Sequence, residues 1–132
     1  MTDRIDHISA ISLFVDDLAA AKAFYADVFA APQIVEDAQS VALRFENLII
    51  NLLHVDAAVQ QVEPDPVAPR AAGSRVQFSV WVDDVEAVCN ALRARGVPLL
   101  TGPRDRPWGL RTATFADPSG HNWEVGQWIK TS

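Results

Sequence analysis

Hydrophobic and polar residues follow each other along the start of the chain in a pattern that predicts a strand and then a helix. Residues 8–15 are rich in β-branched and aromatic side chains, which is typical of a strand. Asp16 and Asp17 follow, and a side-chain oxygen here can accept hydrogen bonds from the free amides of a helix start. From Leu18 apolar residues recur at helical spacing, and we expect this helix to end before Pro32.

Three further strands are expected after this helix. Residues 41–45 and 48–54 predict two strands joined by a turn at Glu46 and Asn47, and residues 33–35 predict a short strand before them. The first half of the chain is thus predicted to be a βαβββ module.

The same order returns in the second half of the chain. The segment from Ile11 to Asp17 reappears as the segment from Phe78 to Asp84, 67 residues later (78 − 11). A repeated unit usually cannot bury its apolar face alone, so the copies must pack against each other or against a second chain. The elements expected here are strands at 75–82, 110–115 and 122–128, a helix at 85–95, a short strand from Leu99, a loop at 101–109 and a turn at 117–120.

Length and repeat together predict one α+β domain over residues 1–132. Its first module is expected at residues 5–55 and its second at 74–128. Residues 56–73 contain several prolines among small and acidic residues, so we expect a linker without helix or strand.

The net charge of the chain argues against anionic macromolecules and membranes as partners. The formal net charge is −6, so the overall field repels phosphate backbones and anionic membrane surfaces. Nucleic acid and membrane are therefore not expected as partners. Hydrophobic residues make up 49% of the chain, which is enough to fill a globular core.

Cysteine content and the N-terminus bear on location. The chain has one cysteine, Cys89, which excludes an internal disulfide and is expected to pack as a small buried hydrophobe. No window of the sequence approaches the ~20 apolar residues that cross a bilayer. The expected location is the cytoplasm.

Three features of the sequence resemble a known superfamily. The first is the pair of βαβββ modules, and the second is the Val-Asp-Asp junction that ends at Asp17 and again at Asp84. The third is the segment from Asp117 to Glu124, Asp-Pro-Ser-Gly-His-Asn-Trp-Glu. Over about residues 5–128 the chain resembles the vicinal oxygen chelate superfamily, which includes glyoxalase I, bleomycin resistance proteins and extradiol dioxygenases. The resemblance implies that each module forms half of a barrel and that the two halves enclose a cup for a ligand.

The resemblance also implies a divalent-metal site with two ligands in each module. The ligand positions map onto Ala10, Asn51, Gln77 and Glu124. This set offers one carboxylate, two amides and a methyl group, whereas zinc, nickel and iron prefer imidazole, thiolate or several carboxylates. His7 could contribute only if the first strand were bulged, because a separation of three residues sends it to the opposite face from Ala10. We expect no metal and no other cofactor.

The expected cup wall mixes polar and apolar side chains. Residues two apart in a strand share a face, which adds Ser12 and Ser79 to the ligand-binding candidates Asn51 and Gln77. This composition suits a pocket that holds an organic molecule by apolar contact while a few polar groups orient it.

The loop at 101–109 is a candidate lip for this cup. Trp108 lies between a proline and a glycine, where an indole can stack on a flat ligand or form a structural lid. Arg111 is a candidate for binding a carboxylate or enolate. Arg104 and Arg106 are expected instead as solvated charges partly paired with Asp105. Trp81, Trp123 and Trp128 lie in predicted strands, where core or interface packing is the expectation.

Glu124 is the candidate catalytic residue. In an enclosed cup without a metal it could act as a general base or donate a hydrogen bond to a ligand. The expected function is metal-independent binding, and sequestration, of an aromatic or anionic small molecule. The alternative is a lyase, isomerase or dioxygenase of the same superfamily acting through Glu124 with or without a metal. Because each half needs a complementary half, we expect a homodimer.

Overall fold

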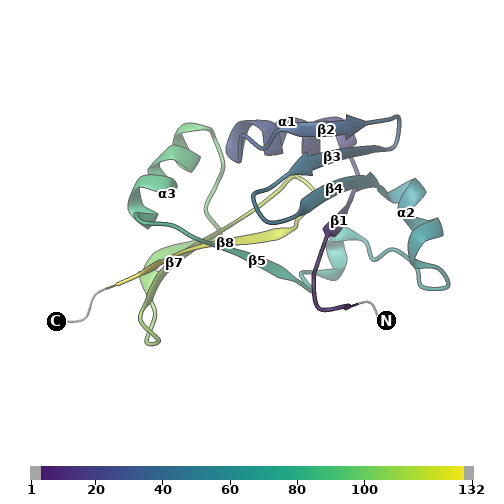
Figure 1. The fold of residues 1–132 in the computed structure, drawn as a ribbon. Helices are drawn as coiled ribbons and strands as arrows, with labels where there is room; N and C mark the ends of the chain where they lie inside the picture. Colours follow the sequence, from purple (N-terminus) through teal and green to yellow (C-terminus); the bar gives the residue numbers. More distant parts are fainter. Residues whose placement is uncertain (1–3, 130–132) are drawn as a thin grey trace. The chain divides into compact units, whose positions relative to one another are not determined.

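A computed structural model describes residues 4–129 of the chain (Figure 1). The chain divides into two compact units, one ending at Ala68 and the other beginning at Pro69, and each contains one four-stranded sheet. Each unit runs strand, helix and then three strands. The predicted α+β class with two βαβββ modules is confirmed.

In the first unit, the first and last strands of the module lie side by side. Its sheet has the order β1-β4-β3-β2, with β1 parallel to β4 and the other neighbours antiparallel. The bounds are β1 Ala10–Val15, α1 Leu18–Val28, β2 Gln33–Glu36, β3 Ser40–Arg44, β4 Ile49–His54 and α2 Val55–Val62.

Helix α1 covers one face of this sheet. It starts where the two aspartates predict, because Asp17 Oδ1 accepts a hydrogen bond of 3.0 Å from the amide of Ala20. Its fully buried residues, Ala21 and Tyr25, pack on the face that carries Leu13 and Leu52, which are also buried. Burial of this apolar stripe is what holds the helix to the sheet.

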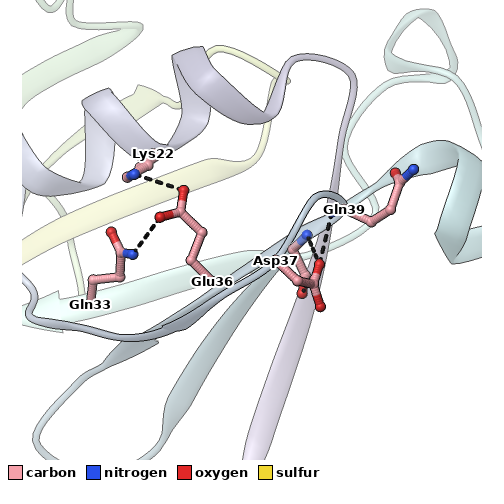
Figure 2. Close-up of polar contacts among 6 residues, drawn as sticks. Lys22, Gln33, Glu36, Asp37 and Gln39 are labelled. Carbon is pink, nitrogen blue, oxygen red and sulfur yellow. Dashed lines mark hydrogen bonds and ion pairs between the residues drawn. The ribbon is translucent and has the colours of Figure 1, made fainter.

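Polar contacts join α1 to the edge strand β2 (Figure 2). Lys22 Nζ lies 2.7 Å from Glu36 Oε1, and Gln33 Nε2 donates to Glu36 Oε2 at 2.8 Å. The Lys22 hydrogen bond, with that of Gln33, lowers the pKa of Glu36. In the following turn Asp37 Oδ1 accepts from the amides of Gln39 and Ser40.

The second unit repeats this plan. Its sheet has the order β5-β8-β7-β6, with β5 parallel to β8 and the other neighbours antiparallel. The bounds are η1 Arg70–Ala72, β5 Gln77–Trp81, α3 Val85–Ala94, β6 Thr101–Asp105, β7 Leu110–Ala116 and β8 Asn122–Trp128.

Helix α3 is positioned by hydrogen bonds at its start and by apolar packing. Asp84 Oδ1 accepts from the amide of Ala87 at 3.1 Å, and the amide of Val85 donates to Gln127 Oε1 at 2.9 Å. Cys89 and Leu92 are buried on the helix, as predicted for Cys89, and burial raises the pKa of the Cys89 thiol.

The expectation of an unstructured linker at 56–73 is wrong in part. Residues Val55–Val62 form α2, with His54 Nδ1 accepting from the amide of Asp56 at its start. Val55, Ala58, Val59 and Val62 recur at helical spacing, and all the prolines of the segment lie beyond this helix. Ala58 is fully buried because α2 packs against β4 and β1.

The expected loop at 101–109 is largely a strand. Residues Thr101–Asp105 form β6, whose pairing with β7 is interrupted between Thr101 and Arg104. Gly102 makes this interruption possible. It has a φ of +83°, and a Cβ there would lie 2.3 Å from the carbonyl oxygen of Thr112.

An ion pair joins the two strands of this β6–β7 hairpin. Arg111 Nε donates to Asp105 Oδ1 at 2.7 Å. This hydrogen bond lowers the pKa of the Asp105 carboxyl and raises that of the Arg111 guanidinium.

Among residues 4–129, no helix has the length and apolar character needed to cross a lipid bilayer.

Substitution of Gly102 tests the glycine requirement. We expect Gly102→Ala to lower the free energy of unfolding by about 3 kcal/mol, because it adds a backbone clash to the cost of a positive φ. Gly109→Ala is the matched control in the same hairpin. Its φ is +90° but a Cβ there meets nothing within 4 Å, so about 1 kcal/mol is expected. Urea denaturation measures both, and equal losses would contradict the clash.

The Asp105–Arg111 ion pair predicts a pH effect. Removing the guanidinium in Arg111→Gln should raise the pKa of Asp105 toward the value of a free aspartate. Because the folded-state pKa is lowered, the pair stabilises the fold above the ordinary aspartate pKa and loses this effect as the pH falls through the lowered value. Carboxyl NMR titration measures the shift. Asp37, whose pKa is lowered first by the amide of Gln39, should not change.

Candidate functional site

One face of the second sheet gathers three of the polar residues that the sequence singled out. The strand register places Ser79 opposite Glu124 and Glu124 opposite Thr114. Because alternate side chains of a strand share a face, one side of the sheet, here called the Glu124 face, follows from this register. Its members are Gln77, Ser79, Trp81, Leu110, Thr112, Thr114, Ala116, Asn122, Glu124, Gly126 and Trp128.

The opposite face belongs to the core of the unit. Ala113, Phe115, Trp123 and Val125 alternate with the residues of the Glu124 face and are buried. Helix α3 packs against their strands, β7 and β8. Trp123 is thus a core residue, as predicted.

Hydrogen bonds between β5 and β8 order the Glu124 face. Ser79 Oγ donates to Glu124 Oε1 at 2.8 Å, and Gln77 Nε2 donates to Asn122 Oδ1 at 2.7 Å. Glu124 and Asn122 are half-buried, whereas Gln77 and Ser79 are exposed. The structure therefore brings together three of the predicted site residues and adds Asn122. A carboxylate has about four lone-pair sites, so Glu124 can accept further hydrogen bonds from a ligand.

The first unit carries a corresponding pair at the same register. Ser12 lies opposite Asn51, and Asn51 Nδ2 is 3.5 Å from Ser12 Oγ, which is a long contact. Ser12 precedes Ser79 by the 67-residue repeat (79 − 12). Asn51 in this unit thus holds the strand position that Glu124 holds in the second unit.

Arg111 does not join the Glu124 face. It is paired across the sheet with Gln127, and both lie one residue out of step with Glu124, on the side of α3. Its guanidinium is bonded to Asp105 and is influenced by Glu86 and Asp84 at the start of α3. Arg111 was predicted to bind a carboxylate or enolate, and in the structure its guanidinium is paired with the carboxylate of Asp105.

Arg106, unlike Arg111, reaches the Glu124 face. Its Nε donates to Thr112 Oγ1 at 3.0 Å, and its guanidinium carbon lies 5.5 Å from the centre of the Trp108 ring. Trp108 is 60% exposed in the turn between β6 and β7. Arg106 was expected to be a solvated charge, and the alternation Thr112, Thr114 in β7 was the signal for this face.

For two strand tryptophans, where packing in the core or at an interface was predicted, the core alternative is wrong. Trp81 and Trp128 are 55% and 65% exposed, so neither is a core residue of its unit. Their ring centres are 6.2 Å apart. The six-membered ring of Trp81 lies over Gly126, where a Cβ would come within 2.6 Å of Cζ3.

The residues at the implied metal positions do not fit a transition-metal site. Ala10 has no donor atom, Asn51 and Gln77 are neutral amides, and Glu124 alone is anionic. Within residues 4–129 there is no cluster of three or more His, Cys, Asp or Glu side chains arranged to hold a metal. Residue His7 lies before β1, outside the strand. One carboxylate does not offset the dehydration of a divalent transition-metal ion.

His121 has a partner within the turn that precedes β8. His121 Nδ1 is 2.7 Å from Asp117 Oδ2, and Asp117 Oδ1 accepts from the amides of Ser119 and His121. The amide of Gly120 donates to the carbonyl of Asp117, which closes the predicted turn. His121 therefore fixes the entry of β8.

Solved structures share this fold across nearly the whole chain. A glyoxalase/bleomycin resistance protein/dioxygenase from Nocardioides matches with a TM-score of 0.85 at 23% identity, over 99% of this chain and 89% of that one. A lactoylglutathione lyase from Agrobacterium tumefaciens matches with a TM-score of 0.75 at 25% identity, over 94% and 95%. The fosfomycin resistance protein FosX from Listeria monocytogenes has a TM-score of 0.70 at 20% identity, over 98% and 96%.

Sequence comparison agrees with the fold. The uncharacterized protein Mb0911c of Mycobacterium bovis is 30% identical over 125 residues, which cover 89% of this chain and 81% of that protein. The model of the Glyoxalase/Bleomycin resistance protein/Dioxygenase superfamily matches residues 4–125. The chain belongs to the glyoxalase/bleomycin resistance protein/dioxygenase superfamily.

Proposed function

We propose that this protein binds an organic small molecule on the Glu124 face without a metal ion. One observation carries the proposal: the positions that the superfamily resemblance assigns to metal ligands hold a methyl group, two carboxamides and one carboxylate. The carboxylate accepts a hydrogen bond from Ser79, and one carboxamide donates to Asn122. Such groups orient an organic ligand by hydrogen bonds.

The Glu124 face supports aromatic contact as well. Trp81 offers an exposed indole beside Gly126, and Arg106 brings a cation to Thr112 on the same face. Ser12 and Asn51 form the equivalent polar pair of the first unit and are proposed ligand-binding residues there, and Trp108 is a further exposed ring in the second unit. Sequestration of the bound compound is part of the proposal, in line with the bleomycin resistance proteins of the superfamily.

Catalysis through Glu124 is a second candidate. The hydrogen bond from Ser79 holds the carboxylate in a defined orientation, which acid–base chemistry requires. The similar structure from Agrobacterium tumefaciens is named a lactoylglutathione lyase. In this version Glu124 transfers a proton to or from the bound molecule, and the product differs from the ligand.

Binding in the presence of a chelator tests the proposal. We expect members of an aromatic fragment library to bind in excess EDTA, with affinity reduced about tenfold in Glu124→Gln because a hydrogen bond to a charged group is lost. Ligand-detected NMR measures the affinity, and mass spectrometry of the recovered compound detects turnover. Glu46→Gln, an exposed turn residue, is the charge-matched control.

Two outcomes separate the candidates. Recovery of an altered compound from the wild type but not from Glu124→Gln would favour the enzyme over sequestration. Near-stoichiometric nickel, zinc or iron in the purified protein, with binding abolished by EDTA, would overturn the metal-independent reading.

The proposed assembly is a homodimer in the cytoplasm. Exposed apolar side chains such as Ile8 and Val35, at 64% and 61% exposure, support an association of this kind. Light scattering at micromolar concentration should give twice the chain mass. The monomer mass of 14.4 kDa would contradict the dimer.

A further inference from the structure

The Trp81 side chain lies against Gly126 on the Glu124 face, and more than half of it is exposed to solvent. Trp81 is paired with Gly126 across β5 and β8, and its Cζ3 and Cε3 would lie 2.6 and 2.8 Å from a Cβ at that glycine. The indole therefore occupies the space that any other residue at position 126 would fill. It is nevertheless 55% exposed, and the ring of Trp128 meets it at 57°.

An acid lies next to this aromatic pair. Glu124 and Gly126 are two residues apart on β8 and point to the same face, which places them about 7 Å apart along the strand. Ser79, two residues before Trp81, donates to Glu124 Oε1 at 2.8 Å. A carboxylate and the exposed indole surface thus border one site.

The cationic side chain of the Glu124 face, Arg106, is bonded to β7, whereas Trp81 belongs to β5 on the other side of β8. Thr112, which receives the hydrogen bond from Arg106, is opposite Gly126 on β7, whereas Trp81 is opposite Gly126 on β5. The Arg106 guanidinium lies over Trp108. Trp81 and Trp128 have their ring contact with each other.

The first unit shows how the same position looks when the chain covers it. The 67-residue repeat places Phe14 where the second unit has Trp81 (81 − 14), and Phe14 pairs with Leu53 as Trp81 pairs with Gly126. Leu53 is only 4% exposed, and α2 packs against its strand. In the second unit β8 is the last element of residues 4–129, and the aromatic pair is exposed. Grouped exposed apolar side chains mark binding sites.

We propose that Trp81, Trp128 and Glu124 form a site for the ammonium group of a small organic cation. The face of an indole attracts cations more strongly than other aromatic side chains do. The negative carboxylate of Glu124 also attracts a cation. The net charge of −6 on the chain favours the approach of cations as well. An anionic ligand would be repelled by the Glu124 carboxylate. A second copy of this acidic chain packed here would bury that carboxylate at a cost in desolvation.

This inference rests on the proposed function and specifies one part of its ligand. Choline and its neutral isostere 3,3-dimethylbutan-1-ol are the probes, since they differ only in the charged centre. We expect choline to shift the indole N–H signals of Trp81 and Trp128 saturably in ¹H–¹⁵N NMR spectra. The neutral alcohol should bind about tenfold more weakly. Equal affinity for the two probes would overturn the cation site.

Three variants locate the site. Glu124→Gln should weaken choline binding about tenfold, and Gly126→Ala should weaken it similarly because its methyl group displaces the indole while the carboxylate remains. Glu46→Gln removes the same charge from an exposed turn and should have no effect. Circular dichroism checks that each variant is folded, and Glu124→Gln keeps the test intact if Gly126→Ala does not fold.

The failures of the two proposals can be told apart. Absence of choline shifts at Trp81 and Trp128, or equal weakening in Glu46→Gln and Glu124→Gln, overturns the cation site. The proposed function then stands if neutral aromatic fragments still bind in a Glu124-dependent manner. It falls if no fragment does.

Discussion

The register of β8 between β5 and β7 is the constraint on which both faces of the second unit depend. It sets Ser79 and Thr114 on either side of Glu124, and it sends Trp123 and Val125 toward α3. A shift of one residue would bury the acid and expose the core, so the apolar packing under the helix is what fixes the polar face. The turn from Asp117 to Gly120 starts β8 in this register.

The duplication lets one scaffold carry different chemistry in its two halves. Asn51 and Glu124 hold the same position relative to the paired serine, yet one is neutral and the other an acid. Backbone pairing and the helix-facing apolar residues preserve the module, while the side chains of the other face are free to change. In this chain they include amides, hydroxyls, a methyl group and one carboxylate, a set that suits hydrogen bonding better than transition-metal ligation.

Glycines mark the two places where the second sheet departs from a regular ladder. Gly102 allows β6 to approach the backbone of Thr112, and Gly126 leaves room for the indole of Trp81. The first brings the β6–β7 hairpin, and with it Arg106, to the Glu124 face. The second lets the indole of Trp81 lie against β8, two residues from Glu124. Both shape the candidate site through the absence of a side chain.

The sequence by itself determined the elements whose signals are local. Strand alternation, the aspartate caps at Asp17 and Asp84 and the 67-residue repeat were enough to predict two βαβββ modules and the superfamily resemblance. The resemblance implied that Gln77 lies near Glu124, and period-two alternation added Ser79 because alternation within a strand is a local property. The predictions for the linker and for the arginine-rich loop were wrong in part. The prolines beyond Val62 led to α2 being missed, and the irregular pairing at Gly102 led to β6 being missed.

Only the tertiary structure decided which neighbouring strands share a face and in what register. The sequence favoured Arg111 over Arg106 as a ligand-binding residue, but pairing across β7 places Arg111 on the side of α3, whereas Arg106 donates to Thr112. The position of the Trp81 indole against the sheet likewise depends on Gly126, a residue 45 positions away in the chain (126 − 81). Such contacts depend on pairing between distant segments, and no pattern within one strand records them.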